Sequence, residues 1–208
     1  MPETTSISII NYGVGNIASL TNMLEHVGAD AQLCADSAQI ARSRAILLPG
    51  VGSFAYAMQM LRAGGFDEAI REAAVNGAML LGVCLGMQLL ARYSEEGDAE
   101  GLGLIAADVR RIAPTRDGVK VPNMGWCEVR PARESWMIRS GEPPDRFYFA
   151  HSYHMVCDDP SDVVATIAYD GIKTVAVEQG NVCGVQFHPE KSHRYGMRLL
   201  ADFAGRAT

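Results

Sequence analysis

Three residue types that together carry out acyl transfer occur in two short segments far apart in the chain. Cys84 lies in Gly-Val-Cys-Leu-Gly, residues 82–86, and His188 and Glu190 lie in His-Pro-Glu, residues 188–190. A thiol nucleophile, an imidazole base and a carboxylate that orients the imidazole can transfer an acyl group through a thioester. We therefore predict that Cys84, His188 and Glu190 form a catalytic triad.

The residues around the triad predict how each segment is held. Cys84 follows the apolar run 78–83 and precedes the run 87–92, as expected for a turn between a buried strand and a helix. Such a nucleophile elbow strains the backbone and leaves no room for side chains two positions away, where this chain has Gly82 and Gly86. Pro189 favours extended backbone at His188, so the side chains of His188 and Glu190 should point to the same side.

A glycine-rich segment supplies candidate oxyanion donors. Pro-Gly-Val-Gly, residues 49–52, ends an expected strand and precedes an expected helix. Backbone N–H groups there can face an oxyanion that forms near Cys84. An ordinary glycine turn is the alternative.

The pattern of apolar runs predicts an α/β fold. In the first half, expected strands at 7–11, 31–34, 45–48 and 78–83 alternate with expected helices at 16–27, 53–61 and 66–75, which indicates a mostly parallel sheet flanked by helices. The C-terminal half is β-rich, with segments at 126–129, 146–150, 163–169, 174–178 and 182–187 that we expect to form hairpins extending the sheet. A helix at 192–203 closes the fold. We expect one domain over residues 1–208.

Composition narrows the class of protein. The chain has 208 residues, a net charge of −6 and a pI near 5.3, with no basic cluster, which disfavours a nucleic-acid partner. Residues 1–6 lack the features of a signal peptide, and no apolar run is long enough to span a membrane. The five cysteines are scattered without a C-x-x-C pair, so we expect reduced thiols, no metal and no cofactor, with Cys34 and Cys183 in the core. A cytoplasmic protein is the expected result.

A competing motif lies near the N-terminus. Residues 13–18, Gly-Val-Gly-Asn-Ile-Ala, match a dinucleotide-binding fingerprint, and Asp36 follows at the position of a ribose-binding acid. The alternative is a tight glycine turn with Asn16 as the helix N-cap. A non-catalytic nucleotide-binding module therefore remains a rival, although it explains neither Cys84 nor His188.

These motifs resemble the class I, triad-type glutamine amidotransferases. Four further segments narrow the resemblance to the family of glutaminase subunits of imidazole glycerol phosphate synthase, and this resemblance extends over essentially the whole chain. These are Asn-Tyr-Gly-Val-Gly-Asn at 11–16, Pro-Asn-Met-Gly-Trp at 122–126, Phe-Tyr-Phe-Ala-His-Ser-Tyr at 147–153 and His-Pro-Glu-Lys-Ser at 188–192. Asn123 and Cys127 depart from the commoner family spelling, Pro-His-Met-Gly-Trp-Asn.

The resemblance implies a role for each matching residue. Cys84 would be the nucleophile, His188 the acid and base, and Glu190 the orienting group. The oxyanion donors would be the backbone N–H of Leu85 and one from the Gly50–Val51 peptide, which reorients before catalysis. The implied glutamine-binding residues are Gly52, Gln88, Glu96, Ser152 and Tyr153.

The resemblance also implies a partner and a pathway. The chain would hydrolyse L-glutamine and deliver ammonia to a (βα)8-barrel synthase subunit, forming a heterodimer that makes imidazole glycerol phosphate and aminoimidazole carboxamide ribonucleotide in histidine biosynthesis. The implied interface residues are Asn16, Met124, Trp126, Tyr148 and Lys191. Trp126 and Tyr148 as core aromatics, and Lys191 as a solvated surface charge, are the alternatives. Two rival enzymes remain: a glutaminase with another ammonia acceptor, as in the pyridoxal phosphate or anthranilate pathways, and a cysteine peptidase.

Overall fold

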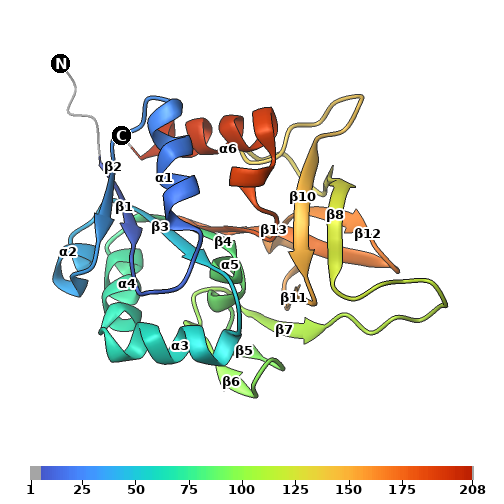
Figure 1. Ribbon diagram of the computed structural model, residues 1–208, viewed down its shortest axis with the longest axis horizontal. Helices are drawn as coiled ribbons and strands as arrows, with labels where there is room; N and C mark the ends of the chain where they lie inside the picture. The colour runs from blue at the N-terminus through green and yellow to red at the C-terminus, as the bar shows by residue number, and fades with distance from the viewer. Residues whose placement is uncertain (1–5, 208) are drawn as a thin grey trace.

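The computed structural model describes residues 6–207, and its centre is a parallel sheet (Figure 1). Five strands lie side by side in the order β2 (Ala31–Cys34), β1 (Ile7–Ile10), β3 (Ala45–Gly50), β4 (Met79–Cys84) and β14 (Val182–Val185). Because parallel strands end at the same edge of a sheet, the carboxyl ends of β3, β4 and β14 bring three of the sequence motifs together.

Mostly antiparallel strands from the rest of the chain continue this sheet. Beyond β14 follow β13 (Ile172–Gln179), β11 (Tyr153–Cys157), β7 (Ala107–Arg111) and the short strands β5 (Tyr93–Ser94) and β6 (Ala99–Glu100). The strands β12 (Val163–Ala168) and β9 (Arg130–Pro131) branch from β13. The expectation of a β-rich second half is confirmed.

One part of that expectation is wrong. β8 (Asn123–Glu128) and β10 (Arg146–His151) pair with each other in a separate two-stranded sheet and do not extend the main one. Figure 1 shows these two strands standing beside the main sheet, in front of β12 and β13. The alternation of apolar and polar residues predicts that a segment forms a strand, but it does not identify the strand with which that segment pairs.

Helices cover both faces of the parallel sheet. On one face lie α1 (Ile17–His26) and α6 (His193–Arg206), and on the other lie α3 (Phe54–Ala63) and α4 (Phe66–Val75), with the short helices α2 (Ser37–Ala41) and α5 (Leu85–Leu89) beside them (Figure 1). Two 3-10 turns, η1 (Pro160–Asp162) and η2 (Pro189–Lys191), complete the elements. The helix expected after Cys84 ends earlier than the apolar run 87–92 indicated, and α2 was not expected from the sequence.

Alternation along the strands divides the core into two layers. Ile46 and Leu48 of β3 are fully buried against α3 and α4, whereas Leu47 is fully buried on the side of α1 and α6. Cys34 and Cys183 are also fully buried, as expected. Burial of a side chain of this size stabilises the fold by about 1.5 to 3 kcal/mol, so the sheet that carries the motifs is firmly held.

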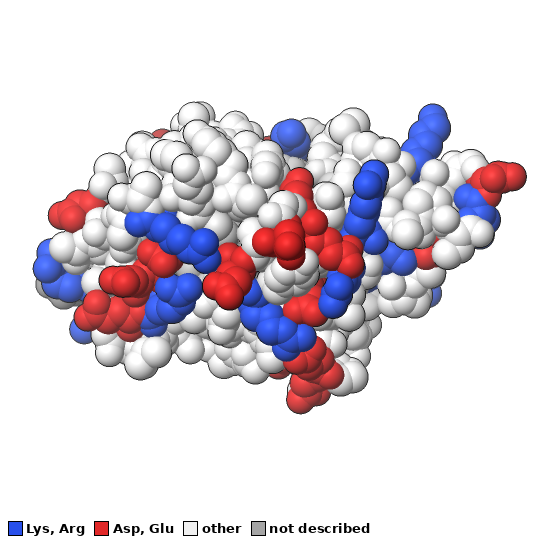
Figure 2. Space-filling model, turned by 90° about the horizontal axis from the view of Figure 1, so that it is seen from below, with Lys and Arg blue, Asp and Glu red and all other residues white. Residues whose placement is uncertain are grey.

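The surface carries mixed charge. Arg92 pairs with Asp108 of β7 and with Asp158, which follows β11, and Arg110 pairs with Asp108 and Glu95. Figure 2 views the side on which α3 and β6 lie, where acidic and basic side chains are interspersed and neither sign covers the face. No helix within residues 6–207 has the length and apolarity to cross a membrane. The expectation that no signal peptide is present concerns mainly residues 1–5, which lie outside the described residues.

Candidate active site

Cys84 occupies a strained turn at the end of β4. Its φ and ψ are 57° and −111°, a conformation that non-glycine residues rarely adopt and that is concentrated at functional sites. The backbone closes tightly around it, because a Cβ at Gly82 would lie 2.6 Å from the carbonyl oxygen of Gly86 and a Cβ at Gly86 would lie 1.9 Å from that of Leu48. The two glycines are therefore obligatory, as the elbow pattern predicted.

His188 and Glu190 meet in the turn that follows β14. The backbone at His188 is extended, and its Nδ1 lies 2.9 Å from Oε1 of Glu190. Only 4% of His188 is exposed, and 1% of the Glu190 side chain. Burial lowers the pKa of His188, but the interactions with Cys84 and Glu190 outweigh burial and raise this pKa to about 9. The structure thus brings Cys84, His188 and Glu190 together, with an imidazolium favoured beside the thiol.

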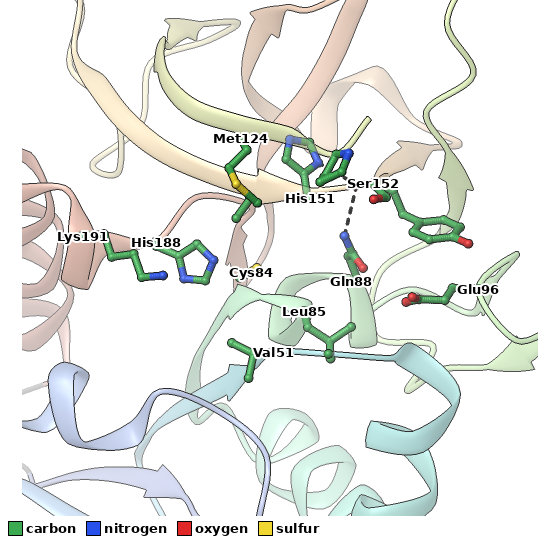
Figure 3. Close-up of a pocket in the computed structure, with 14 residues that line it drawn as sticks. Val51, Cys84, Leu85, Gln88, Glu96, Met124, His151, Ser152, His188 and Lys191 are labelled. Carbon is green, nitrogen blue, oxygen red and sulfur yellow. Dashed lines mark hydrogen bonds between the residues drawn. The ribbon is translucent and has the colours of Figure 1, made fainter. Parts of the chain in front are cut away.

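A pocket of about 360 Å³ opens beside this triad (Figure 3). The residues that line it come from six separate parts of the chain and are Val51, Gly52, Cys84, Leu85, Gln88, Glu96, Pro122, Met124, Ala150, His151, Ser152, Tyr153, His188 and Lys191. Every residue that the sequence analysis assigned to glutamine binding is among them. In Figure 3, Cys84 and His188 lie on one side of the pocket and Glu96 on the other, with Gln88 between them.

The segment 49–52 lies directly against the elbow. Gly50 pairs in register with Cys84, and a Cβ on Gly50 would lie 2.7 Å from the backbone nitrogen of Gly86. The next two residues are held less closely, since Val51 is 41% exposed and Gly52 has a φ of +96° with open space around it. Backbone groups of this segment therefore lie close to the sulfur while the segment itself leaves the packed sheet.

The expected glutamine-binding residues differ in their contacts. Gln88, 4% exposed, donates from Nε2 to the carbonyl oxygen of Tyr153 at 3.2 Å, the bond drawn in Figure 3. Glu96 accepts a bond at 2.9 Å from the backbone N–H of Phe54, at the N-terminus of α3. Gln88 keeps its carbonyl oxygen free of these bonds, so an acceptor is available at the centre of the pocket.

Two residues of the site were missed from the sequence. Gln186 is fully buried and lies between Gln88 and Cys84, 2.8 Å from Nε2 of Gln88 and 3.9 Å from the sulfur. His151 lines the pocket, and burial lowers its pKa to about 4. The spacing of Gln186, two residues before His188, was a signal that could have found it, because alternate residues of an extended chain share a side.

His151 is held in one tautomer by its neighbours. Its Nδ1 lies 2.7 Å from the carbonyl oxygen of Tyr153, which can only accept, so Nδ1 carries the proton. The other nitrogen, Nε2, then accepts from the side-chain amide of Asn123 at 3.0 Å. Cys127 donates weakly to Asn123 at 3.8 Å. The two positions that depart from the commoner family sequence thus belong to one cluster with His151, in which Asn123 and His151 are buried and Cys127 is half-buried.

Several of the expected interface residues lie together beside the pocket. Met124 is 65% exposed and Trp126 is 40% exposed, so Trp126 is not a core aromatic. Its ring stacks on His193 at 5.6 Å and meets Tyr148 edge-on at 6.3 Å. Lys191 holds its ammonium 5.6 Å from the centre of the Tyr148 ring. These residues form a partly apolar surface next to Cys84.

The glycine-rich loop after β1 packs against the site. A Cβ on Gly15 would lie 3.0 Å from the Pro49 ring. Asn16 occupies the N-cap position of α1, as the alternative reading has it, but its side chain donates to Glu190 at 3.4 Å and makes no capping hydrogen bond. Asp36, the candidate ribose ligand, caps α2 through the backbone N–H of Ala38. Among residues 6–207 no cluster of three His, Cys, Asp or Glu side chains is placed to hold a metal.

Comparisons with known proteins point to one family. The model of the family "Glutamine amidotransferase class-I" matches residues 8–207. The chain is 45% identical to imidazole glycerol phosphate synthase subunit HisH 2 of Pseudomonas aeruginosa, over 95% of this chain and 98% of that protein. It is 43% identical to subunit HisH of Geobacillus kaustophilus, over 97% of each chain.

Solved structures share the fold. A crystal structure of a glutamine amidotransferase superposes with a TM-score of 0.73 at 21% identity, covering 95% of this chain and 98% of that one. The structure of PurLQS from Thermotoga maritima superposes with a TM-score of 0.70 at 19% identity, covering 98% of this chain and 97% of that one. The α/β fold class expected from the sequence is confirmed.

Proposed function

The chain belongs to the class-I glutamine amidotransferase family, within the group of imidazole glycerol phosphate synthase HisH subunits, and from this premise we propose that Cys84, His188 and Glu190 hydrolyse glutamine. Membership makes the chain part of an enzyme and implies glutamine hydrolysis in histidine biosynthesis. The proposal adds which residues act and how. One observation carries it: a buried imidazole, bonded to Glu190 at 2.9 Å, faces a cysteine held in a strained elbow beside a pocket.

The first half of the reaction forms a thioester. The sulfur of Cys84 attacks the side-chain carboxamide carbon of glutamine, and the C–N bond breaks as His188 gives its proton to the departing nitrogen, which leaves as ammonia. The raised pKa of His188 favours the imidazolium needed for this step. Glu190 holds Nδ1 of the imidazole, so that Nε2 faces the reacting atoms.

Backbone N–H groups stabilise the negative oxygen of the tetrahedral intermediate. One donor is Leu85, the first residue of α5, and the second comes from the Gly50–Val51 peptide at the end of β3. Removing one such donor costs about 100- to 1,000-fold in rate. Since Val51 and Gly52 have left the packed sheet, a change in this peptide can switch the activity.

The second half releases glutamate. A water molecule gives a proton to His188 and attacks the thioester carbon, the C–S bond breaks, and Cys84 is restored. Gly52, Gln88, Glu96, Ser152 and Tyr153 hold the amino-acid part of glutamine during both halves. Gln88 contributes its carbonyl oxygen, which is left free because both of its hydrogen bonds, to Tyr153 and to Gln186, are donated from Nε2.

Ammonia then passes to a second subunit. We assign the surface of Asn16, Met124, Trp126, Tyr148 and Lys191 to a (βα)8-barrel synthase, which uses the ammonia to make imidazole glycerol phosphate and aminoimidazole carboxamide ribonucleotide. Residues 1–208 act as one glutamine amidotransferase domain in this heterodimer. The five free cysteines fit a reducing compartment, so we place the reaction in the cytoplasm.

The test measures glutamate release from glutamine. The purified chain is assayed alone, and then with a (βα)8 synthase and its nucleotide ligand, beside a Cys84→Ala variant. Activity that requires the mixture and disappears in the variant supports the gated triad. Strong activity without a partner overturns the gating. Hydrolysis without transfer of ammonia to the nucleotide overturns the assigned acceptor, and activity that survives Cys84→Ala overturns the triad.

A further inference from the structure

A line of buried amides connects the glutamine end of the pocket to the nucleophile. Gln88, on α5, donates from Nε2 to the backbone carbonyl of Tyr153 at 3.2 Å and to Oε1 of Gln186 at 2.8 Å. Gln186 follows β14 and is fully buried, with its backbone N–H bonded to the carbonyl oxygen of Val175 at 2.9 Å. From Nε2 it donates to the sulfur of Cys84 at 3.9 Å.

The direction of these bonds is fixed from one end. The carbonyl oxygen of Tyr153 can only accept, so Gln88 must turn its nitrogen toward it. Gln88 then donates its second N–H to Gln186, so Gln186 must accept this bond with its side-chain oxygen. The side-chain nitrogen of Gln186 therefore points toward Cys84. Reversing either amide would set two like groups against each other in a buried site, at the cost of an unpaired polar group.

We propose that Gln186 is a positioning residue that joins substrate binding to the nucleophile: its oxygen keeps the carbonyl of Gln88 turned to glutamine, and its N–H holds the sulfur of Cys84. This rests on the function proposed above and adds to it a residue outside the triad. Gln186 does not line the pocket and therefore acts through Gln88 and Cys84.

The two ends have separable consequences. The bond to Gln88 sets an acceptor for glutamine, so its loss raises KM. The bond to Cys84 places a hydrogen-bond donor on the attacking sulfur, so its loss lowers kcat. The titratable groups that face Cys84 are His188, after β14, and Tyr12, after β1. His188 is bonded to Glu190 and Tyr12 to the carbonyl oxygen of Pro49, so neither is held by Gln186.

Two variants divide these consequences, and both are assayed in the complex with the synthase partner and its ligand. Gln186→Met is of similar length and loses both bonds, so we expect kcat/KM to fall by about 10-fold or more, with KM raised. Gln186→Glu keeps an acceptor for Gln88 but places a carboxylate beside the sulfur. We expect its KM to stay within about 3-fold of the parent while kcat falls at pH 8 and recovers toward pH 6, as the carboxyl gains a proton that it can donate. The control is Gln179→Met, at the exposed end of β13.

A second measurement needs neither glutamine turnover nor the partner. The rate of Cys84 alkylation by iodoacetamide is measured at one fixed pH on the free chain, with the modified peptide identified by mass spectrometry. We expect alkylation to be slower in Gln186→Met than in the parent and in Gln179→Met. This arm still decides the role of Gln186 at Cys84 if the parent chain hydrolyses no glutamine, an outcome that would sink the proposed function alone.

Two results would overturn the positioning role. One is that the two Gln186 variants have the same effects as each other on kcat and on KM, and that both keep the pH profile of the parent. This result is expected if Gln186 only fills space. The other is an unchanged alkylation rate in Gln186→Met. Thermal unfolding of each variant shows whether the changed kinetics come from a folded protein.

Discussion

Two walls of the active-site pocket are held very differently. We call Cys84, Gly86, His188 and their neighbours on β4 and after β14 the elbow wall. Cys84 is 7% exposed there, His188 is 4% exposed, and a methyl group at Gly86 would meet backbone at 1.9 Å. Val51 and Gly52, which follow β3, form the loop wall. There Val51 is 41% exposed, and a methyl group at Gly52 would meet nothing within 4 Å.

The difference in packing between the two walls suits them to different roles, bond formation at the elbow wall and control of activity at the loop wall. Groups that exchange protons and form bonds must be placed accurately, and the elbow wall gives them a packed, buried frame. A segment with few packing contacts opens or reorients at low free-energy cost. We therefore assign the proposed nucleophile to the elbow wall and the proposed partner-dependent oxyanion donor to the loop wall. The comparison can be tested by changing one wall at a time.

The largest effect on stability and activity should come from adding a methyl group in the elbow, where there is no space for one. In Gly86→Ala the new methyl group would overlap the carbonyl oxygen of Leu48, and backbone cannot move aside as a flexible side chain can. We expect the free energy of unfolding to fall by about 4 kcal/mol or more, with glutamine hydrolysis lost. Urea unfolding and the glutaminase assay measure both. Gly141→Ala is the matched control, because no atom lies within 4 Å of its added methyl group. Equal stability of the two variants would contradict the packed elbow.

Next in size is the loss of the carboxylate that orients His188. Glu190→Gln keeps the shape of the side chain but removes the charge that stabilises the imidazolium, so we expect kcat to fall by about 1,000-fold, equivalent to about 4 kcal/mol. Glu190 does not line the pocket, and KM should change by less than about 3-fold. Steady-state kinetics of the complex, with exposed Glu134→Gln as the control, tests this. A change in KM alone would assign Glu190 to binding.

A smaller effect is expected on the pH dependence of stability, because two buried imidazoles have opposite pKa shifts. The pKa of His188 is raised from 6.5 to about 9, so its contribution to stability is complete below pH 6.5 and is lost as the pH rises through 9. Burial lowers the pKa of His151 to about 4, so its contribution is present above pH 6.5 and is lost as the pH falls through 4. Each contribution is on the order of 3 kcal/mol.

Urea unfolding between pH 4 and pH 9 measures these contributions. His188→Gln should flatten the fall in stability on the alkaline side, and His151→Gln should flatten the fall on the acid side. If either variant keeps the parent slope on its own side, the corresponding pKa shift is not linked to folding.

Sequence was sufficient where local sterics determine structure. The bounds of β2 and α4 match the expected ranges, and the glycines at 82 and 86 identified the elbow because the clash that they avoid is set by neighbours in the chain. The His188–Glu190 bond was likewise predictable, since it depends on a spacing of two in extended backbone.

Long-range partners were not predictable in the same way. Asn16 has a type and position suited to an N-cap, yet its side chain bonds Glu190, 174 residues away. His151 and Asn123 pair across β8 and β10, two strands whose separate sheet the alternation pattern does not reveal. In each case a contact between distant segments overrides a local preference. Such a contact cannot be predicted from the local pattern of a single sequence.

The smallest effect, and the one that isolates the loop wall, is expected for Gly52→Ala. Gly52 has a φ of +96°, so a methyl group there costs about 1 to 2 kcal/mol of backbone strain without any clash. Gly180, in the turn between β13 and β14, also has a positive φ, +61°, and open space, and it lies outside the pocket. Gly180→Ala should therefore lose similar stability in urea while the complex keeps its kcat. Because only Gly52 adjoins the Gly50–Val51 peptide, Gly52→Ala should lower kcat by about a further 10-fold. Equal kcat in the two variants would mean that the conformation of the loop wall does not limit catalysis, and the oxyanion donor would then have to be sought on the elbow wall alone.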